Sequence, residues 1–327
     1  MRMMTEARPL ISVVTPSYNE ERNLPALYER LKAAFADPAL TAVDWEWIVI
    51  DDHSADGTFA VAEAIAKADS RVRVLRFSRN FGSHVGIACG IDHARGDCCV
   101  VMAADLQDPP EAISGLVAKW RAGAQVVWAV RASRPGEAAG TLVFAGLYYL
   151  MMRRVVGLNA LPATGADFVL LDKRVMAAVR AHGERNMSIL ALIAWMGFRQ
   201  DEIRYDKRAR TEGESGWTLT KKIKLVVDSL TSFSYLPIRA MSLLGLCVAV
   251  CGLLYSAVVV VNALFGHPAE GWSSLMVAVL VLGGAQMLML GVLGEYVWRG
   301  LDESRRRPRY LIEACSFDDA DSADTAA

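Results

Sequence analysis

Four short clusters in this sequence combine residues whose types could do chemistry. They are Thr15-Pro-Ser-Tyr-Asn-Glu20, Asp51-Asp-His-Ser-Ala-Asp-Gly-Thr58, Ser78-Arg-Asn-Phe-Gly82 and Asp105-Leu-Gln-Asp-Pro-Pro110. A single aspartate of this kind most often caps a helix or forms a turn. Several carboxylates in one cleft, however, require a cation or hydrogen-bonding ligand groups, because unpaired like charges repel. Together the clusters indicate a site for a polar ligand, provided that the fold brings them together.

Each cluster directly follows a short apolar run rich in β-branched residues. The expected strands cover 10–14, 45–50, 72–75, 98–102 and 125–130, and the expected helices cover 23–36, 58–68, 84–94 and 110–121. This alternation predicts an α/β domain of right-handed βαβ units around a mostly parallel sheet. Because ligands bind at the carboxyl ends of parallel strands, the clusters should meet at one edge of the sheet.

Two further motif matches suggest other kinds of ligand site, but the residues around them do not fit those sites. Asp52-His-Ser-Ala-Asp-Gly57 followed by Glu63 has the ligand spacing of an EF-hand loop, yet a β run rather than a helix precedes it. The stretch 80–86 contains glycines without forming G-x-G-x-x-G or a Walker A loop. We therefore predict neither a calcium loop nor a nicotinamide or P-loop nucleotide site.

In order along the chain, the polar clusters and their flanks read V-V-T-P-S-Y-N-E, V-I-D-D-H-S-A-D-G-T, S-R-N-F-G, D-L-Q-D-P-P-E and G-A-D-F-V-L-L-D. This ordered set resembles the family 2 glycosyltransferases of the polyprenyl-phosphate branch. That branch includes dolichol-phosphate mannose synthase and bacterial undecaprenyl-phosphate glucosyltransferases of O-antigen modification. The resemblance implies a GT-A fold that transfers a sugar from a nucleotide donor, commonly a UDP-sugar, to a lipid-linked phosphate. It does not identify the sugar.

On the matching positions, the resemblance also implies a donor site and a metal site. The nucleotide-sugar residues would be Pro16, Tyr18, Glu20, Asp52, Arg79 and Arg134. The family's metal motif D-A-D-L-Q reads Ala103-Ala-Asp-Leu-Gln107 here, so an alanine replaces its first aspartate. Asp105 and Gln107 remain as candidate ligands for Mg²⁺ or Mn²⁺, since hard cations take oxygen donors and Mg²⁺ can keep waters and substrate phosphates.

The candidate catalytic residues are Asp105, Arg131 and Asp167. Arg131 and Arg134 match the family's R-x-x-R and could meet phosphate charge, while Asp167 matches an acidic position often assigned as the base. A phosphate monoester has a second pKa near ~6, so the acceptor is largely dianionic at neutral pH and hardly requires a base. We expect Asp167 to orient the acceptor or the sugar, or to be only a turn residue. Direct displacement predicts inversion at the anomeric carbon.

Two long uncharged stretches lie near the C-terminus. Residues 240–269 and 271–294 contain no Asp, Glu, Lys or Arg, and each exceeds the ~20 residues needed to span a bilayer. The short connection 266–271 contains Pro268 and two glycines, which predicts a transmembrane hairpin with helices over about 240–265 and 272–298. Buried helices of a soluble bundle are the alternative, although such helices rarely stay uncharged on every face.

The charges around the hairpin predict its orientation. Lys and Arg lie before the first stretch and after the second, whereas the connection contains only His267 and Glu270. The positive-inside rule then places both termini in the cytoplasm. The resemblance to bacterial undecaprenyl-phosphate glucosyltransferases implies that the protein lies in the cytoplasmic membrane of a bacterium. We expect a cytoplasmic catalytic domain over 1–203 and a cytoplasmic tail over 299–327 that is first basic and then acidic.

The segment 204–239 is basic and amphipathic. Between Arg204 and Lys224 there are seven Lys or Arg and three acids, a local net charge of +4. Its apolar positions recur at helical spacing, which is typical of a helix lying on anionic lipid. We expect Arg208, Arg210 and Lys221 to contact the acceptor phosphate. A basic face that contacts only lipid headgroups is the alternative.

Composition and motifs argue against several other classes of protein. With 35 Lys and Arg against 36 Asp and Glu, the net charge of −1 argues against nucleic-acid binding. A processive polysaccharide synthase would carry Q-x-x-R-W and more spans, and a transporter would place charged residues in its spans. A catalytically weakened sensor or scaffold stays open because of Ala103. Gly252, Gly283 and Gly284 could pack a homo-oligomer or the hairpin on itself.

Overall fold

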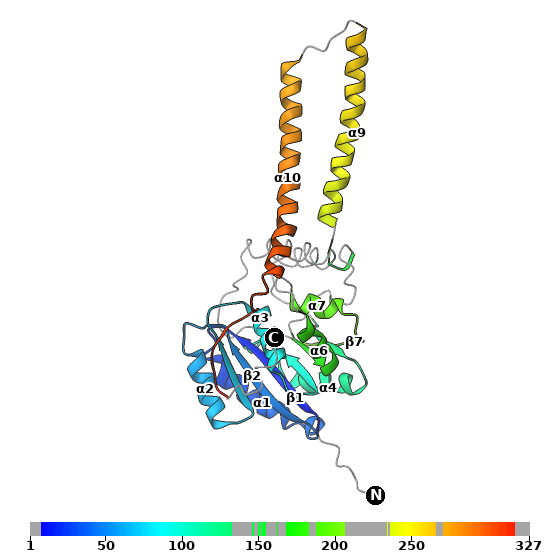
Figure 1. Ribbon diagram of the computed structural model, residues 1–327. Coiled ribbons are helices and arrows are strands. Elements are labelled where there is room, and N and C mark those ends of the chain that lie inside the picture. Colours follow the sequence, from blue (N-terminus) through cyan, green and yellow to red (C-terminus); the bar gives the residue numbers. More distant parts are fainter. Residues whose placement is uncertain are drawn as a thin grey trace. The chain divides into compact units, whose positions relative to one another are not determined.

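The structure is a computed structural model that describes residues 8–132, 146, 150, 152–154, 162, 168–182, 188–206, 234, 236–265 and 271–317. The chain divides into two compact units (Figure 1). The first consists of Met1–Trp217 together with Pro308–Ala327, and the second is Thr218–Arg307. The first unit therefore takes in both ends of the chain.

The first unit is built on one mixed sheet. Its strands are β1 (Leu10–Ser17), β2 (Asp44–Asp51), β3 (Val72–Phe77), β4 (Cys98–Val101), β5 (Val126–Arg131), β6 (Phe168–Asp172), β7 (Gln200–Tyr205) and β8 (Ile312–Cys315). Over the described residues the order is β7-β5-β6-β4-β1-β2-β3-β8. Strand β6 runs antiparallel to β4 and β5, and β8 runs antiparallel to β3, while the other pairs are parallel. The predicted mostly parallel α/β sheet is confirmed.

The helices that connect the strands include the four that the sequence pattern predicts and two, after β6, that it does not. They are α1 (Asn23–Phe35), α2 (Thr58–Ala68), α3 (Ser83–His93), α4 (Ile113–Arg121), α6 (Lys173–Ala181) and α7 (Ile189–Trp195), with single turns η1 (Pro38–Leu40) and η2 (Pro110–Ala112). In α1, Leu24, Leu27 and Leu31 recur at helical spacing and are fully buried. The expected helix over 110–121 begins as η2 and continues as α4.

Helix α3 lies unusually close to the strands beneath it. A methyl group at Gly90 would overlap the Val14 side chain, and one at Gly86 would lie 3.0 Å from Cβ of Pro16. These glycines are one helical turn apart, so one face of α3 can approach β1 without side chains between them. The close approach brings the N-terminal end of α3 beside the end of β1.

The expected cytoplasmic tail over 299–327 is not wholly a tail. Helix α10 continues to Ser304, and Ile312–Cys315 forms β8, the edge strand beside β3. The Tyr310 ring stacks on Phe77 at 5.4 Å, and the Arg73 guanidinium lies 4.0 Å from the Phe317 ring. The apolar and aromatic residues of this segment pack against β3. Its backbone pairs with the edge of the sheet that β3 would otherwise leave open.

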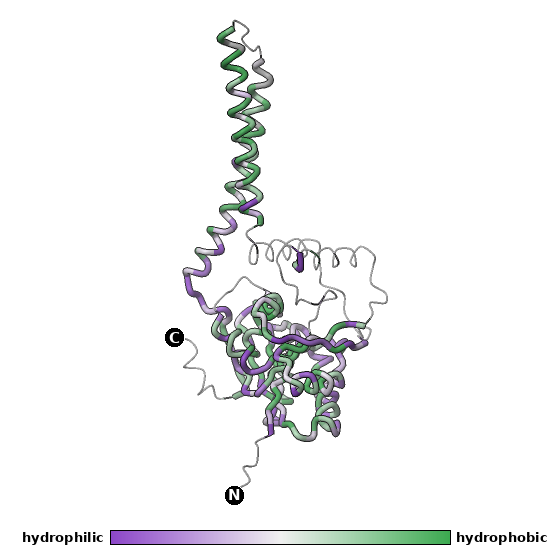
Figure 2. Tube along the Cα trace, turned by 90° about the vertical axis from the view of Figure 1, so that its right-hand side faces the viewer, coloured by the Kyte–Doolittle hydropathy of each residue, from purple (hydrophilic) through white to green (hydrophobic). Residues whose placement is uncertain are grey.

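The second unit contains two long helices, α9 (Leu236–Leu264) and α10 (Trp272–Ser304). Both are long and apolar enough to cross a membrane, over Leu236–Val261 and Leu275–Ser304. Figure 2 shows them hydrophobic along most of their length, with a hydrophilic C-terminal end of α10. The Tyr296 hydroxyl donates a 2.8 Å hydrogen bond to the Ser234 carbonyl oxygen, joining α10 to the residues just before α9.

The three glycines predicted to pack these helices do not contact a neighbouring helix in the part of the chain described. A methyl group at Gly252, Gly283 or Gly284 would have no described atom within 4 Å, whereas one at Gly245 would lie 3.4 Å from Met289 Cε. Packing of those three glycines between subunits stays a prediction.

Candidate active site

The carboxyl ends of the parallel strands share one edge of the sheet. Ser17 lies opposite Asp51 in the pairing of β1 with β2, and Asp51 lies opposite Arg76 in the pairing of β2 with β3. Val14 pairs with both Ile48 and Val101, so β4 runs toward the same edge and ends three residues before β1 and β2. The polar clusters that follow these strands therefore lie along one edge, as parallel pairing requires.

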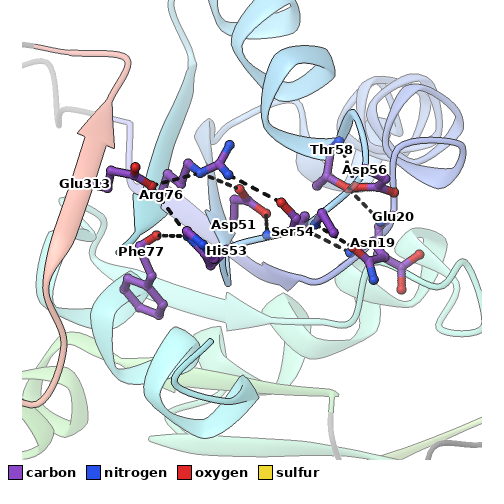
Figure 3. Close-up of polar contacts among 11 residues, drawn as sticks. Asn19, Glu20, Asp51, His53, Ser54, Asp56, Thr58, Arg76, Phe77 and Glu313 are labelled. Atoms are coloured by element: carbon purple, nitrogen blue, oxygen red, sulfur yellow. Dashed lines mark hydrogen bonds and ion pairs between the residues drawn. The ribbon is translucent and has the colours of Figure 1, made fainter. Parts of the chain in front are cut away.

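The loops after β1 and β2 are hydrogen-bonded to each other (Figure 3). The Asn19 N–H donates to Ser54 Oγ at 2.9 Å, and the Ala55 N–H donates to Asn19 Oδ1 at 3.0 Å. Asn19 and His53 have φ angles of 58° and 59°, a left-handed conformation that non-glycine residues seldom adopt. Such strained positions concentrate at ligand sites and persist only where neighbouring contacts enforce them.

Glu20, predicted to bind the nucleotide, is also part of this junction. Its N–H donates to Thr58 Oγ1 at 2.8 Å, and its carboxylate accepts a 2.6 Å hydrogen bond from Asn23 Nδ2 at the start of α1. The next residue, Glu21, accepts a 2.7 Å hydrogen bond from the Gly57 N–H. Glu20 thus has a structural role whether or not it contacts a ligand.

Pro16 and Tyr18 differ in their availability to a ligand. Pro16 contacts α3 at Gly86, as described above. The Tyr18 side chain is 50% exposed at the end of β1, so its ring is accessible to a ligand. Large apolar rings are usually buried, and an exposed ring beside a polar cluster suits stacking on a planar group.

Asp52 binds the start of α3. Its Oδ1 accepts a 2.6 Å hydrogen bond from the Phe81 N–H, and its Oδ2 accepts one of 2.9 Å from the Gly82 N–H. Burial raises the pKa of the Asp52 carboxyl, the neighbouring charge of Asp51 adds to the rise, and the two backbone hydrogen bonds oppose it. Asp52 therefore fixes the loop after β3, and each oxygen still has a lone pair for a ligand.

Arg79, also predicted to bind the donor, belongs to that same loop. Its guanidinium lies 4.3 Å from the centre of the Phe81 ring, within cation–π distance. Asp52 holds the Phe81 backbone, so one carboxylate determines the position of the loop that presents this cation.

The turn after β4 contains both predicted metal ligands. Leu106 has φ 59°, and the Gln107 N–H donates to Asp105 Oδ1 at 3.2 Å, which defines a tight turn. Arg30 of α1 supports the turn with a 3.4 Å hydrogen bond to the Leu106 carbonyl oxygen. Within the described residues no group of three or more His, Cys, Asp or Glu is placed to hold a metal.

This donor set fits Mg²⁺ or Mn²⁺ only with help from a substrate. A carboxylate and a side-chain amide are hard oxygen donors, and substrate phosphates with waters commonly complete such a shell. Because Ala103 supplies no second carboxylate, the protein's own share of such a shell would be the two predicted ligands, Asp105 and Gln107.

Sequence reasoning missed a buried network beside this turn. The Tyr205 hydroxyl donates a 2.5 Å hydrogen bond to Asp108 Oδ1, and Arg131 lies opposite Tyr205 in the pairing of β5 with β7. Burial, with the charge of Asp108, raises the pKa of Tyr205, so this phenol stays protonated. The position of Asp108 directly after the metal motif was the only available signal, since Tyr205 lies in no motif.

Five predicted site residues lie outside the described residues. They are Asp167, Arg134, Arg208, Arg210 and Lys221. Of the predicted catalytic set, the structure thus places Asp105 and Arg131 at the ends of β4 and β5.

The fold and the strand-end site define a GT-A-like glycosyltransferase, and the chain belongs to glycosyl transferase family 2, whose model matches residues 12–162. It is 35% identical over 304 residues to the bactoprenol glucosyl transferase of Shigella phage SfV, covering 93% of this chain and 98% of that protein. It is 36% identical over 303 residues to YkcC, an uncharacterized glycosyltransferase of Bacillus subtilis, covering 92% and 93% of the two chains. The family predicted from the motifs is confirmed.

Solved structures share the fold at low sequence identity. Glucosyl-3-phosphoglycerate synthase from Mycobacterium tuberculosis, in complex with phosphoglyceric acid, has a TM-score of 0.52 and 18% identity over 69% of this chain and 80% of that one. The same enzyme with Mn²⁺, UDP-glucose and phosphoglyceric acid has a TM-score of 0.50 and 19% identity over 68% and 79%. These likenesses establish the GT-A-like architecture.

Proposed function

We propose that this glycosyltransferase moves a sugar from a UDP-sugar, of the glucose type, to a polyprenyl phosphate such as undecaprenyl phosphate. The observation that carries the proposal is the extent of the similarity. A relative named bactoprenol glucosyl transferase aligns over 93% of this chain, a share too large to leave out the two apolar C-terminal helices. The lipid-linked product would serve cell-envelope glycan modification.

The donor assignment rests on the strand-end edge. Pro16 lies at the end of β1, Tyr18, Glu20, Asp52 and Arg79 lie in the loops along the edge, and Arg134 is assigned there from the motif. A fold relative holds UDP-glucose with Mn²⁺, which supports a UDP-sugar donor and a divalent cation for this chain. The exposed Tyr18 ring suits stacking on a planar base.

The lipid phosphate would be the nucleophile. One of its oxygens forms a bond to the anomeric carbon while the bond from that carbon to the diphosphate breaks, and the electron pair leaves with the nucleoside diphosphate. A single displacement of this kind inverts the anomeric configuration. Asp105 and Gln107 would hold Mg²⁺ or Mn²⁺, which supplies neutralisation of the leaving diphosphate. Arg131 adds positive charge there, and Asp167 orients the acceptor or the sugar.

The acceptor would reach this edge from a membrane surface. Arg208, Arg210 and Lys221, in the basic segment 204–239, would bind its phosphate, and α9 and α10 would anchor the enzyme as a transmembrane hairpin. By the positive-inside rule, the Lys and Arg flanking the hairpin support a cytoplasmic position for the catalytic domain and both termini.

Transfer of radiolabelled sugar to undecaprenyl phosphate in detergent tests the proposal. A panel of UDP-sugars is assayed with Mg²⁺, with Mn²⁺ and with a chelator, and Asp105→Asn serves as the site variant. We expect one donor to give a lipid-linked, inverted product only with metal and only with the wild-type enzyme. Nucleotide binding without product from any donor would instead support the sensor or scaffold that Ala103 leaves open.

A further inference from the structure

The C-terminal strand β8 brings a carboxylate to the loop after β2. Glu313 Oε2 lies 3.2 Å from Arg76 Nε and 3.5 Å from His53 Nδ1 (Figure 3). Arg76 also faces Asp51, whose Oδ2 is 3.6 Å from the same Nε. One guanidinium thus lies between a carboxylate of the catalytic sheet and a carboxylate that follows both apolar helices in the sequence.

The contacts continue from Arg76 into the loops of the donor edge. Arg76 Nη2 donates a 3.4 Å hydrogen bond to the Ser54 carbonyl oxygen, and Asp51 Oδ1 accepts a 3.1 Å hydrogen bond from the Ser54 N–H. Ser54 Oγ in turn accepts the Asn19 N–H. A continuous series of polar contacts therefore runs from Glu313 to the loop that contains Tyr18 and Glu20.

Strand β8 is anchored without Glu313. The Ser78 N–H donates to the Leu311 carbonyl oxygen at 3.0 Å, and the Val74 N–H donates to Ser316 Oγ at 2.9 Å. The Tyr310 hydroxyl donates to Asp92 Oδ2 at 3.0 Å. These contacts hold the strand in register, so the Glu313 carboxylate is presented at a defined place rather than from a free tail.

The charges around Arg76 explain why the position of the Glu313 carboxylate matters. Asp51 is fully buried and adjoins Asp52, so two carboxylates would repel each other at the end of β2 without a cation. Arg76 supplies the cation, and its guanidinium is also held by contacts to Glu313 and to the Ser54 carbonyl oxygen. We propose that Glu313 is a positioning residue for the nucleotide-sugar site and acts on it through Arg76. This inference rests on the proposed function of that edge.

A surface ion pair of no consequence is the competing explanation, because Glu313 is 51% exposed and exposed pairs contribute little. Binding of UDP with MnCl₂, measured calorimetrically on the full chain in detergent, separates the two. We expect Glu313→Gln to weaken UDP binding and raise the donor KM about two- to fivefold, with kcat and acceptor KM unchanged. Arg76→Gln should weaken UDP binding about tenfold or more, because it leaves buried Asp51 without a cation.

Ser316→Ala is the matched control. It removes a hydrogen bond between the C-terminal segment and β3 but leaves Arg76 untouched, so UDP binding should match wild type. If Glu313 acts through Arg76, Glu313→Gln should add no further loss in the Arg76→Gln background. Thermal unfolding of each variant verifies that it is folded.

Several outcomes would overturn the positioning role. They are unchanged UDP binding in Glu313→Gln, an equal loss in Ser316→Ala, or full additivity of Glu313→Gln with Arg76→Gln. Each of these leaves the proposed function standing as long as wild type binds UDP and transfers sugar. A wild-type enzyme that binds no UDP overturns the donor assignment and the positioning role together.

Discussion

Tyr205 and Arg131 lie directly opposite each other as the last paired residues of the parallel strands β7 and β5, and the positive charge of Arg131 opposes the rise in the pKa of Tyr205. The same phenol donates to Asp108, which follows the turn of the predicted metal ligands. A single tyrosine thus ties the ends of β5 and β7 to the loop after β4. The position of Arg131 relative to Asp105 therefore depends on a residue that no motif contains.

Replacement of this phenol should affect turnover as well as stability. Tyr205→Phe leaves a buried Asp108 oxygen without its donor, which should lower the free energy of unfolding by about 1–3 kcal/mol. It also removes the hydroxyl beside Arg131, a predicted catalytic residue, so we expect kcat for sugar transfer to fall about tenfold. Tyr28→Phe is the control, because it removes a similar tyrosine–aspartate hydrogen bond, 2.7 Å to Asp69, remote from the strand ends. Equal kcat in both variants would contradict the role of Tyr205.

The close approach of α3 should make Gly90 intolerant of a side chain. Gly90→Ala forces a methyl group into fully buried Val14, and overpacking of this kind costs about 1–3 kcal/mol of stability. Gly115→Ala, in α4, has ordinary space with Ile203 Cδ1 at 3.5 Å and should be neutral or stabilising. Thermal unfolding midpoints of both variants in detergent test the contrast, and similar midpoints would refute it.

Restoring the family's missing carboxylate should strengthen metal binding. Ala103→Asp adds a hard oxygen donor two residues before Asp105, so we expect the Mn²⁺ concentration for half-maximal transfer to fall about tenfold. Ala103→Asn, which adds similar volume without charge, should change it much less. An unchanged metal requirement in Ala103→Asp would show that position 103 does not face the cation.

Acid should weaken one ion pair outside the site. Hydrogen bonds from the Arg71 side chain, the shortest 2.7 Å, hold the pKa of Asp69 well below its ordinary value. Such a carboxylate stabilises the fold above its unfolded pKa of about 4, and the stabilisation is lost as pH falls toward the native pKa. Because Arg71 is half-exposed, the gain should be under about 1 kcal/mol. The stability deficit of Asp69→Asn should therefore be largest at pH 6 and shrink below pH ~4, as thermal unfolding would show; a constant deficit would contradict this.

Orientation in the membrane can be tested with a membrane-impermeant maleimide. Exposed Cys315 in the first unit should react only after cells are permeabilised, if that unit is cytoplasmic. A cysteine placed by Glu270→Cys, in the connection between the helices, should react in intact spheroplasts. The opposite pattern at both positions would reverse the proposed topology.

The sequence by itself determined the fold class, the family and the polar clusters of the candidate site. The alternation of apolar runs with helical periods can be recognised from neighbouring residues, so it predicts the strands and helices. Because parallel strands end at one edge of the sheet, it also brings residues such as Asp52 and Asp105 to that edge. The sequence also predicted α9 and α10, because a long stretch without charged residues can be recognised without a structure.

Only the tertiary structure decided which side chains support that edge. Val74 and Ser316 are 242 positions apart, and no local period predicts that the segment after α10 completes the sheet beside β3. The partners of Asp108 and Asp52 likewise come from β7 and from the loop before α3. Such contacts depend on which distant segments share a sheet edge, and that follows from packing of the whole unit rather than from the residues around each motif.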